Sequence, residues 1–341
     1  MIDVKRHVQR IGLPAVAIVM AAVAPALTYH TAQPIAASAT AAVGRGQAAR
    51  AVMTGRWIDL TTMPGARSRP AVVRGHDGNI YVFGGTADYR EYATTFIYHW
   101  RGKAWSLGRN MPTAREGAQA VTLPDGRIAV LGGGTRCGTI LCDHGVVYDR
   151  VEVYDPSANT WARLTPMHSP RYQFAVVPFK GLIYAIGGSD GHRILPTVEA
   201  YNPAANRWQD TSGLPAPRLG PAAVVDGSYL DIIGGAVAND PTLLRYDGHT
   251  WHTGAGLIQP TGGAGATVGR NGLVYVTGGY NNGWLTTAQV YHPRTDSWTL
   301  IAPLPTSLCC MGTVTSADGL IYVVGGDTGT GRSAEIYAYR P

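Results

Sequence analysis

The sequence contains little charge: Asp, Glu, Lys and Arg make up 15% of its 341 residues, against about a quarter in ordinary soluble proteins. Together with 44 Gly residues, this composition excludes a coiled coil and a disordered chain and favours short buried strands joined by tight turns. The basic residues form no run interleaved with aromatic residues, which excludes nucleic acid as a partner.

Several motifs of catalysis and cofactor binding are also missing. No Gly-rich phosphate loop, no H-E-x-x-H and no G-x-S-x-G occurs in the structural context that each requires. The chain has only four Cys residues, and their spacing matches no standard metal motif. The sequence therefore predicts no cofactor and no metal. One alternative remains open, a soft-metal site that combines cysteine with His144 or His192.

The N-terminus differs from the rest of the chain. A basic start precedes an apolar run at residues 11–27, and the small residues that follow include an A-x-A site at 37–39. This order predicts a signal peptide at residues 1–39 and a secreted or extracytoplasmic protein. The alternative is an uncleaved anchor, which would be the chain's only link to a membrane. Residues 40–50 form a linker of small residues.

The remainder of the chain is organised by a repeat, seen most clearly between Trp161 and Trp208. Each copy has four short β-rich runs, and the second run ends on two consecutive Gly residues. These pairs are spaced by 48, 55, 47, 44 and 47 residues, and they are Gly84-Gly85, Gly132-Gly133, Gly187-Gly188, Gly234-Gly235, Gly278-Gly279 and Gly325-Gly326. Six copies of about this length with four strands each predict an all-β fold, a six-bladed β-propeller.

The order of residues within the repeat resembles the kelch family. An apolar run and Gly-Gly are followed by a Tyr such as Tyr201, then by a Trp such as Trp208, and then by an Arg such as Arg218. The resemblance covers residues 51–341 and implies an exported, bacterial-type member of the galactose oxidase/kelch superfamily. Arg67, Arg115, Arg171 and Arg218 share one repeat position, and Glu152, Glu199 and Glu335 share another, so we interpret them as structural.

The two ends of the repeat region complement each other. Residues 56–60 carry the Trp of a fourth strand without the three strands before it, whereas residues 335–339 form a third strand and the chain stops at Pro341. An open propeller would leave strand edges unpaired. We therefore expect the N-terminal strand to close the ring as the outer strand of the last blade.

The kelch resemblance also implies where a ligand binds. The residues just after the repeat Arg position and just after Gly-Gly should face the mouth of the central channel. In this sequence the candidate binding residues are Arg69, Glu116, Tyr172, Gln173, Tyr280, Cys309, Cys310 and Asp327. A mouth with charged, amide and aromatic groups suits a polar ligand, and we predict a carbohydrate or a peptide.

Export would make disulfides the expected state of the four cysteines, which allow three pairings. Cys137 with Cys142 would close a short loop in the longest repeat, and Cys309 would then bond to its neighbour Cys310. Adjacent Cα atoms are about 3.8 Å apart, below the usual disulfide range of about 4.4–6.8 Å, so the second bond would be strained. The rival pairing carries the loop across the channel as a cap.

Two classes of function remain open. The first is a binding module. The second is a carbohydrate-active enzyme similar to the six-bladed sugar epimerases of this superfamily, with Glu116 transferring a proton and Arg69 stabilising negative charge. A galactose-oxidase-like copper enzyme ranks last, because its two Tyr, two His and Cys–Tyr crosslink cannot be placed here. No catalytic residue is assigned. Convergence of Glu116, Arg69 and Tyr172 in one small pocket would favour the enzyme, and an open rim would favour binding.

Overall fold

The computed structural model describes residues 55–137, 141–142, 144–235 and 240–341. These residues belong to the compact unit Ala49–Pro341, and the predicted signal peptide and linker lie outside them. All regular structure in the described residues is β-strand. In this part of the chain no helix has the length and apolar character needed to cross a membrane.

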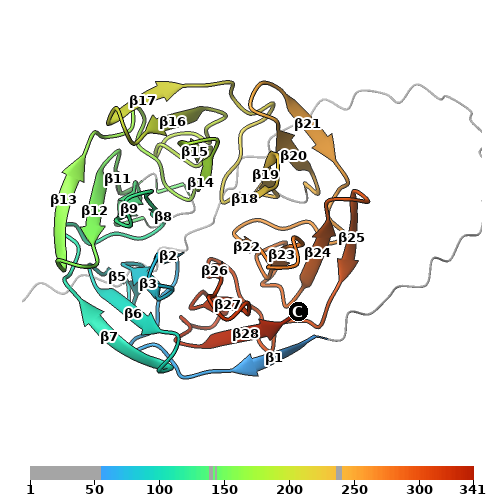
Figure 1. Ribbon diagram of the computed structural model, residues 1–341, viewed down its shortest axis with the longest axis horizontal. Helices are drawn as coiled ribbons and strands as arrows, with labels where there is room; N and C mark the ends of the chain where they lie inside the picture. Colours follow the sequence, from blue (N-terminus) through green and yellow to red (C-terminus); the bar gives the residue numbers. More distant parts are fainter. Residues whose placement is uncertain (1–54, 138–140, 143, 236–239) are drawn as a thin grey trace, which may run out of the picture. The chain divides into compact units, whose positions relative to one another are not determined.

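Six four-stranded antiparallel sheets form the blades, arranged in a ring around a common axis (Figure 1). Blade 1 contains β2 (Ala71–Arg74), β3 (Ile80–Phe83), β6 (Thr95–His99) and β7 (Ala104–Gly108); blade 2 contains β8 (Gln119–Thr122), β9 (Ile128–Leu131), β12 (Val151–Asp155) and β13 (Thr160–Leu164); blade 3 contains β14 (Ala175–Phe179), β15 (Leu182–Ile186), β16 (Val198–Asn202) and β17 (Arg207–Asp210).

The second half of the ring repeats this order. Blade 4 contains β18 (Ala222–Asp226), β19 (Tyr229–Ile233), β20 (Leu243–Tyr246) and β21 (Trp251–Gly254); blade 5 contains β22 (Gly265–Val268), β23 (Val274–Thr277), β24 (Ala288–His292) and β25 (Ser297–Leu300). Blade 6 contains β26 (Gly312–Thr315), β27 (Ile321–Val324) and β28 (Ile336–Arg340), and its outermost strand is β1 (Arg56–Asp59). The all-β, six-bladed architecture expected from the repeat is confirmed.

Strand β1 pairs with β28 from the other end of the chain. The register places Trp57 opposite Tyr339 and Asp59 opposite Tyr337. The indole N–H of Trp57 donates to the Ala302 carbonyl of blade 5 at 2.8 Å, and Trp298 makes the same kind of bond to Ala255. Trp57 therefore stands where the repeat Trp stands in other blades.

The hydrophobic core lies between neighbouring blades. Strands such as β3 and β9 are buried along their whole length, because blades cover both faces, and this explains their unbroken apolar sequences. The turns before them use Asp-Gly, and Gly78, Gly126 and Gly319 have positive φ as that turn chemistry predicts. Because the core is divided among the blade interfaces, neighbouring blades must be held together by direct contacts.

The Gly-Gly pairs provide backbone contacts between neighbouring blades. The first Gly of each pair has φ between 58° and 67°, and a Cβ there would lie 2.1–2.7 Å from a backbone carbonyl oxygen of the next blade. The N–H of the second Gly donates to the same carbonyl, as Gly188 does to Arg218 at 2.7 Å. The recurring Gly-Gly thus permits a backbone contact between blades that any side chain would block.

This contact leads to a stability prediction. Gly187→Ala places a Cβ 2.7 Å from the Arg218 carbonyl, whereas Gly181→Ala, also at positive φ, meets nothing within 4 Å. Both variants carry the same conformational cost, so we expect Gly187→Ala to lower the free energy of unfolding by about 1–3 kcal/mol more. Urea denaturation measures the difference, and equal losses in the two variants would contradict this account of the blade contact.

The repeat Arg and Glu meet as buried ion pairs. Arg115 lies 3.0 Å from Glu152, and Arg171 lies 2.8 Å from Glu199. Both Glu199 oxygens also accept backbone N–H groups, from His168 and Ser169. These side chains hold the loop that enters a blade against the third strand of that blade, which agrees with the structural interpretation of the repeat positions.

Candidate functional site

Six residues, one from each blade, form a closed ring of backbone hydrogen bonds at the inner edge of the propeller. Each N–H donates to the carbonyl of the equivalent residue in the preceding blade, at 2.7–3.1 Å, and the ring consists of Arg69, Gly117, Gln173, Gly220, Gly263 and Cys310. We call these residues the mouth ring. All six have φ between 49° and 64°, so the ring is built entirely from left-handed backbone.

Three of the six positions hold Gly, the residue that adopts this conformation freely. The other three hold Arg69, Gln173 and Cys310, for which left-handed backbone costs roughly 1 kcal/mol or more each. Gly closes the ring equally well in the neighbouring blades. The backbone conformation alone therefore favours Gly at these three positions, and the larger side chains are present in spite of it. Such strain is typical of functional positions.

The three side chains line a cavity of about 70 Å³ on the ring axis, together with Pro70, Phe174 and Met311. A second cavity, of about 160 Å³, shares Pro70 and Met311 and adds mainly small apolar residues. A third, of about 390 Å³, lies at the far end of the inner strands and includes Val73 and Thr315. The polar end of the axial channel is therefore narrow, and its far end is wider.

A larger hollow, of about 550 Å³, lies at the turns of blades 1 and 2 and is lined by His76, Asp77, Asp125 and Asp155, among others. Its carboxylates already accept hydrogen bonds within their own turns, for example Asp77 from Tyr81 at 2.7 Å. Asp125 accepts from Arg127 at 2.8 Å in the same way. These groups cap turns, so we place the candidate site at the mouth ring instead.

Arg69, Glu116 and Tyr172 converge directly behind the ring. The Arg69 Nη1 atom lies 3.2 Å from the Glu116 carboxylate, and a Cβ on Gly117 would lie 2.3 Å from the Tyr172 ring. Glu116 and Tyr172 are buried, and of the three side chains only Arg69 lines the cavity. The three residues thus meet, as the enzyme hypothesis requires, but two of them lie below the surface.

Burial controls the protonation of this group. It raises the pKa of the Glu116 carboxyl, and the charge of Arg69 opposes that increase. Burial also raises the pKa of Tyr172, so its phenol stays neutral. Burial lowers the pKa of Arg69, but the nearby anionic group, the Glu116 carboxylate, acts in the opposite direction and the pKa stays above the ordinary value. The site therefore presents a permanent cation.

Unused hydrogen-bonding groups gather here. Among the residues that the structure describes, Arg69 Nε is buried without a hydrogen-bond partner, and Tyr172 Oη and Gln173 Nε2 are buried with no partner beyond their contact with each other. Leaving a buried donor unpaired costs about 1–3 kcal/mol. A ligand or water with acceptor atoms would remove that cost.

Tyr280 and Asp327 lie further out, on the loops of blades 5 and 6. Tyr280 is 48% exposed and packs edge to face on Trp284, with ring centroids 5.3 Å apart. The Asp327 carboxylate is engaged by Arg332 and by the backbone N–H of Gly329. Tyr280 with Trp284 thus forms an exposed aromatic surface, whereas Asp327 mainly organises its own loop.

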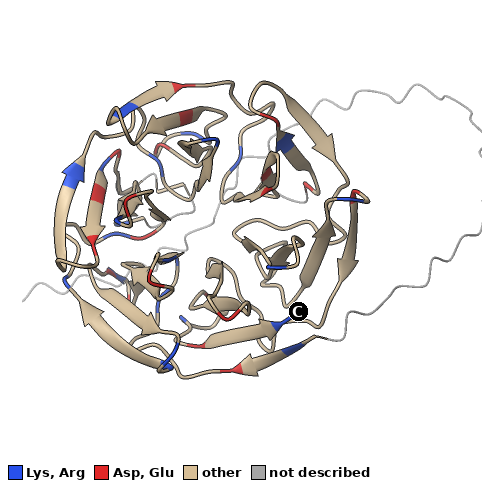
Figure 2. Ribbon diagram, in the orientation of Figure 1, with Lys and Arg blue, Asp and Glu red and all other residues tan. Residues whose placement is uncertain are grey.

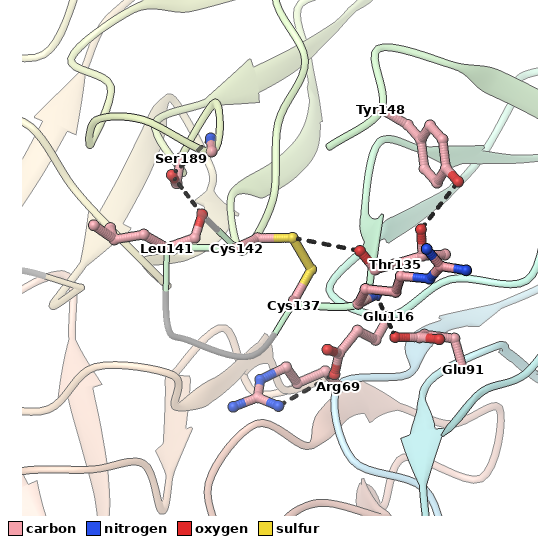
Figure 3. Close-up of a disulfide and its surroundings, with 11 residues drawn as sticks. Arg69, Glu91, Glu116, Thr135, Cys137, Leu141, Cys142, Tyr148 and Ser189 are labelled. Atoms are coloured by element: carbon pink, nitrogen blue, oxygen red, sulfur yellow. Dashed lines mark hydrogen bonds and ion pairs between the residues drawn. A yellow bond between two sulfur atoms is a disulfide. The ribbon is translucent and has the colours of Figure 1, made fainter. Parts of the chain in front are cut away.

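The loop of blade 2 is fixed beside the ring. The disulfide joins Cys137 and Cys142, as the short-loop pairing predicted. Ser189 of blade 3 donates to the Leu141 carbonyl at 2.9 Å (Figure 3). The Arg136 N–H donates to Glu91 of blade 1 at 2.6 Å. Three blades therefore share one braced wall of the mouth.

The second predicted disulfide, between Cys309 and Cys310, is not formed in this structure. Cys309 and Cys310 are free, with their Sγ atoms 2.8 Å apart. The distance between neighbouring Cα atoms, about 3.8 Å, is too short for an unstrained bond. The rival pairing across the channel is wrong as well, since Cys137 and Cys142 are bonded to each other.

One group of residues in the described ranges has the spacing of a metal site: His168, Glu199 and Asp210. Glu199 is already bonded to Arg171 and to two backbone N–H groups. An arginine so close would repel a cation, so we assign no metal there.

Lys, Arg, Asp and Glu are interspersed around the ring of blades (Figure 2).

The sequence indicated several mouth residues but not the ring that they form. Gly117, Gly220 and Gly263 were the available signal, because Gly stands two positions after the repeat Arg position in three of six blades. Tyr89, fully exposed at the tip of the hairpin of β4 (Thr86–Ala87) and β5 (Arg90–Glu91), was also missed. A single exposed Tyr in a loop has no distinctive sequence pattern.

Comparisons with known proteins agree with this architecture. A family model described as the KLHDC2/KLHL20/DRC7 Kelch-repeats domain matches residues 51–235, and a Kelch motif matches residues 264–305. Kelch-like protein 23 of Mus musculus is 28% identical over 273 residues, which cover 77% of this chain and 46% of that protein. Kelch-like protein 25 of Homo sapiens is 32% identical over 235 residues, covering 67% and 40%.

Two further similarities cover a shorter stretch of the chain or concern the fold alone. Beta-scruin of Limulus polyphemus is 32% identical over 139 residues, which cover 39% of this chain and 14% of that protein. The chain spans less than half the length of each of these relatives. The solved structure titled "Structure of YjhT" matches with a TM-score of 0.69 at 16% identity, covering 82% of this chain and 95% of that one. At this identity the match shows the fold alone.

Proposed function

We propose that this chain, which belongs to the kelch-repeat family of β-propellers, is an exported binding protein that holds a peptide segment at its mouth ring. A kelch propeller is typically a module for protein interaction. The observation that carries the proposal is the retention of Arg69, Gln173 and Cys310 at left-handed positions where Gly suffices in other blades. Their side chains surround the axial cavity.

The size of the cavity supports a peptide over an enclosed sugar. Pockets that enclose small ligands measure about 300–1,000 Å³, whereas the mouth cavity measures about 70 Å³. One side chain or terminal group of a longer ligand fits such a space, while the rest of the ligand crosses the rim. The exposed rings of Tyr89, Tyr280 and Trp284 provide contact area on that rim.

The binding proposal predicts that stability and function separate at Gln173. Gln173→Gly removes a side chain from the cavity and relieves left-handed strain. We expect unchanged or higher stability, by up to about 1 kcal/mol, and at least a tenfold loss of peptide binding, equivalent to about 1.4 kcal/mol. A library of extended peptides, screened against the full chain, supplies the probe. Gln209→Gly on an outer strand is the control, since Gln209 lies away from the ring.

Loss of stability together with unchanged binding in Gln173→Gly would contradict the proposal. A panel of free sugars screened in parallel covers the carbohydrate alternative. Thermal shift suits both screens, because a ligand at a hundredfold excess over Kd stabilises the fold by about 2.7 kcal/mol.

The second candidate is a carbohydrate-active enzyme of the epimerase or mutarotase type. The specific observation in its favour is the Arg69–Glu116 pair at 3.2 Å, with Tyr172 behind it. Burial raises the pKa of Glu116, which is the direction that favours a carboxyl group as a general acid or base. Exchange of sugar protons or anomers, followed by NMR, tests this reaction. Activity that Glu116→Gln abolishes would favour the enzyme over the peptide-binding protein.

Export rests on the sequence of residues 1–39, with its basic start, apolar run and A-x-A site. We expect protein recovered from the native host to begin at Thr40 and to appear in the extracytoplasmic fraction. Mass mapping of the N-terminal peptide provides the measurement. Membrane-associated protein that retains Met1 would instead indicate an uncleaved anchor.

A further inference from the structure

Two neighbouring cysteines, Cys309 and Cys310, carry free thiols at the mouth ring, with their Sγ atoms 2.8 Å apart. Cys309 is buried at 6% exposure. Cys310 is partly exposed and lines the axial cavity. One thiol is therefore accessible from the mouth, and the second lies in contact with it.

Packing does not require this pair. Blades 4 and 5 have Leu219-Gly220 and Gly262-Gly263 at the same two positions, and both form the same ring contacts. Cys310 has φ of 60°, where Gly would avoid a cost of roughly 1 kcal/mol. We therefore attribute the presence of two thiols here to their reactivity and not to packing.

The surroundings of the two thiols change their pKa in opposite directions, which gives them different roles. The hydrogen bond with Cys309 lowers the pKa of Cys310, and the charge of Arg69 adds to this effect. The same hydrogen bond, together with burial, raises the pKa of Cys309. Since the thiolate is the nucleophilic form of cysteine, Cys310 is suited to react first and Cys309 to resolve the product.

We propose that Cys309 and Cys310 form a redox-active dithiol that small-molecule disulfides oxidise. In the first step the Cys310 thiolate attacks one sulfur of the small disulfide, which forms a mixed disulfide and releases one small thiolate. In the second step Cys309 gives its proton to that thiolate and attacks the Cys310 sulfur, and the second small thiolate leaves and takes from water the proton that Cys310 had released. The small disulfide gains two electrons and becomes two thiols, while the protein gains one bond between adjacent cysteines.

Oxidation acts on the mouth because Cys310 is part of the ring. The peptide bond fixes neighbouring Cα atoms about 3.8 Å apart, so a disulfide between them must be accommodated by rotation of the backbone on either side of the Cys309–Cys310 peptide. Cys310 donates to Gly263 and accepts from Arg69, both at 2.8 Å. That rotation therefore reaches Arg69, whose guanidinium lines the cavity and contacts Glu116. We therefore expect the mouth cavity to differ in shape between the oxidised and the reduced protein.

The experiment uses the full chain, reduced and then freed of reductant without oxygen. It is incubated in glutathione buffers of increasing disulfide fraction, quenched with acid, alkylated and digested without reduction. We expect the peptide that contains both cysteines to lose two hydrogens and both alkylation sites as the disulfide fraction rises. Cys309→Ser should stop at a glutathione adduct on Cys310. Cys310→Ser should react at least about tenfold more slowly, because its remaining thiol is buried.

Two thiols that stay alkylatable throughout the series would overturn the proposal, and so would equal reaction rates in the two Ser variants. Limited alkylation of the unmodified chain gives a second readout that does not depend on the folding of the variants. Label on Cys310 before Cys309 supports the division of roles, and the reverse order contradicts it. Neither readout uses a ligand, so both are independent of the peptide binding proposed above.

Discussion

A chain that begins at residue 61 is expected to melt roughly 6–12 °C below a chain that begins at residue 51. The deletion removes β1 and, with it, four register pairs with β28 and the packing of Trp57 on Tyr339, whose ring centroids are 5.2 Å apart. Loss of a packed Trp costs about 3 kcal/mol or more. In a domain of this size each kcal/mol shifts the melting temperature by about 2–4 °C. Calorimetry of the two chains measures the difference.

The longer chain is the matched control, because it lacks the N-terminal segment and keeps the strand. The shorter chain also exposes the edge of β28, so we expect it to aggregate more readily. The mouth ring should persist, since Arg69 and Cys310 bond independently of β1. Identical melting curves for the two chains would show that closure of the outer rim by β1 contributes nothing to stability.

Glu199→Ala is expected to lower the free energy of unfolding by about 3–5 kcal/mol. The substitution leaves the Arg171 guanidinium buried without its counter-charge, because both side chains of this pair are at most 2% exposed. It also removes the acceptor of the His168 and Ser169 N–H groups. Urea denaturation monitored by tryptophan fluorescence measures the loss.

Arg193→Ala is the control for this prediction. Arg193 pairs with Asp190 at 3.3 Å, but its side chain is 79% exposed, and an exposed pair of this kind contributes at most about 1 kcal/mol. Similar losses in both variants would mean that burial does not decide the contribution of the repeat pair. A loss confined to Glu199→Ala would explain why Arg and Glu recur at these positions.

The six-bladed fold follows from the sequence because its signals are local and repeated. An apolar run, a Gly pair and a Trp recur in each copy, and they specify strands and turns without reference to distant residues. Gly187 illustrates this point, since two consecutive Gly after a buried run are a local signal, and the structure gives Gly187 a positive φ beside the Arg218 carbonyl. The pairing of Cys137 with Cys142 was one of three that the sequence allowed, and the structure contains it.

The sequence by itself therefore determined the six-bladed propeller, and the kelch resemblance indicated the face on which Arg69 and Gln173 stand. Only the tertiary structure decided that these residues share a hydrogen-bonded ring, that Glu116 and Tyr172 lie beneath it and that Cys309 and Cys310 keep free thiols. Ring members such as Arg69 and Gly117 are 48 residues apart, and they meet only when whole blades pack together. The size and chemistry of the mouth are set by that packing, which no single repeat encodes.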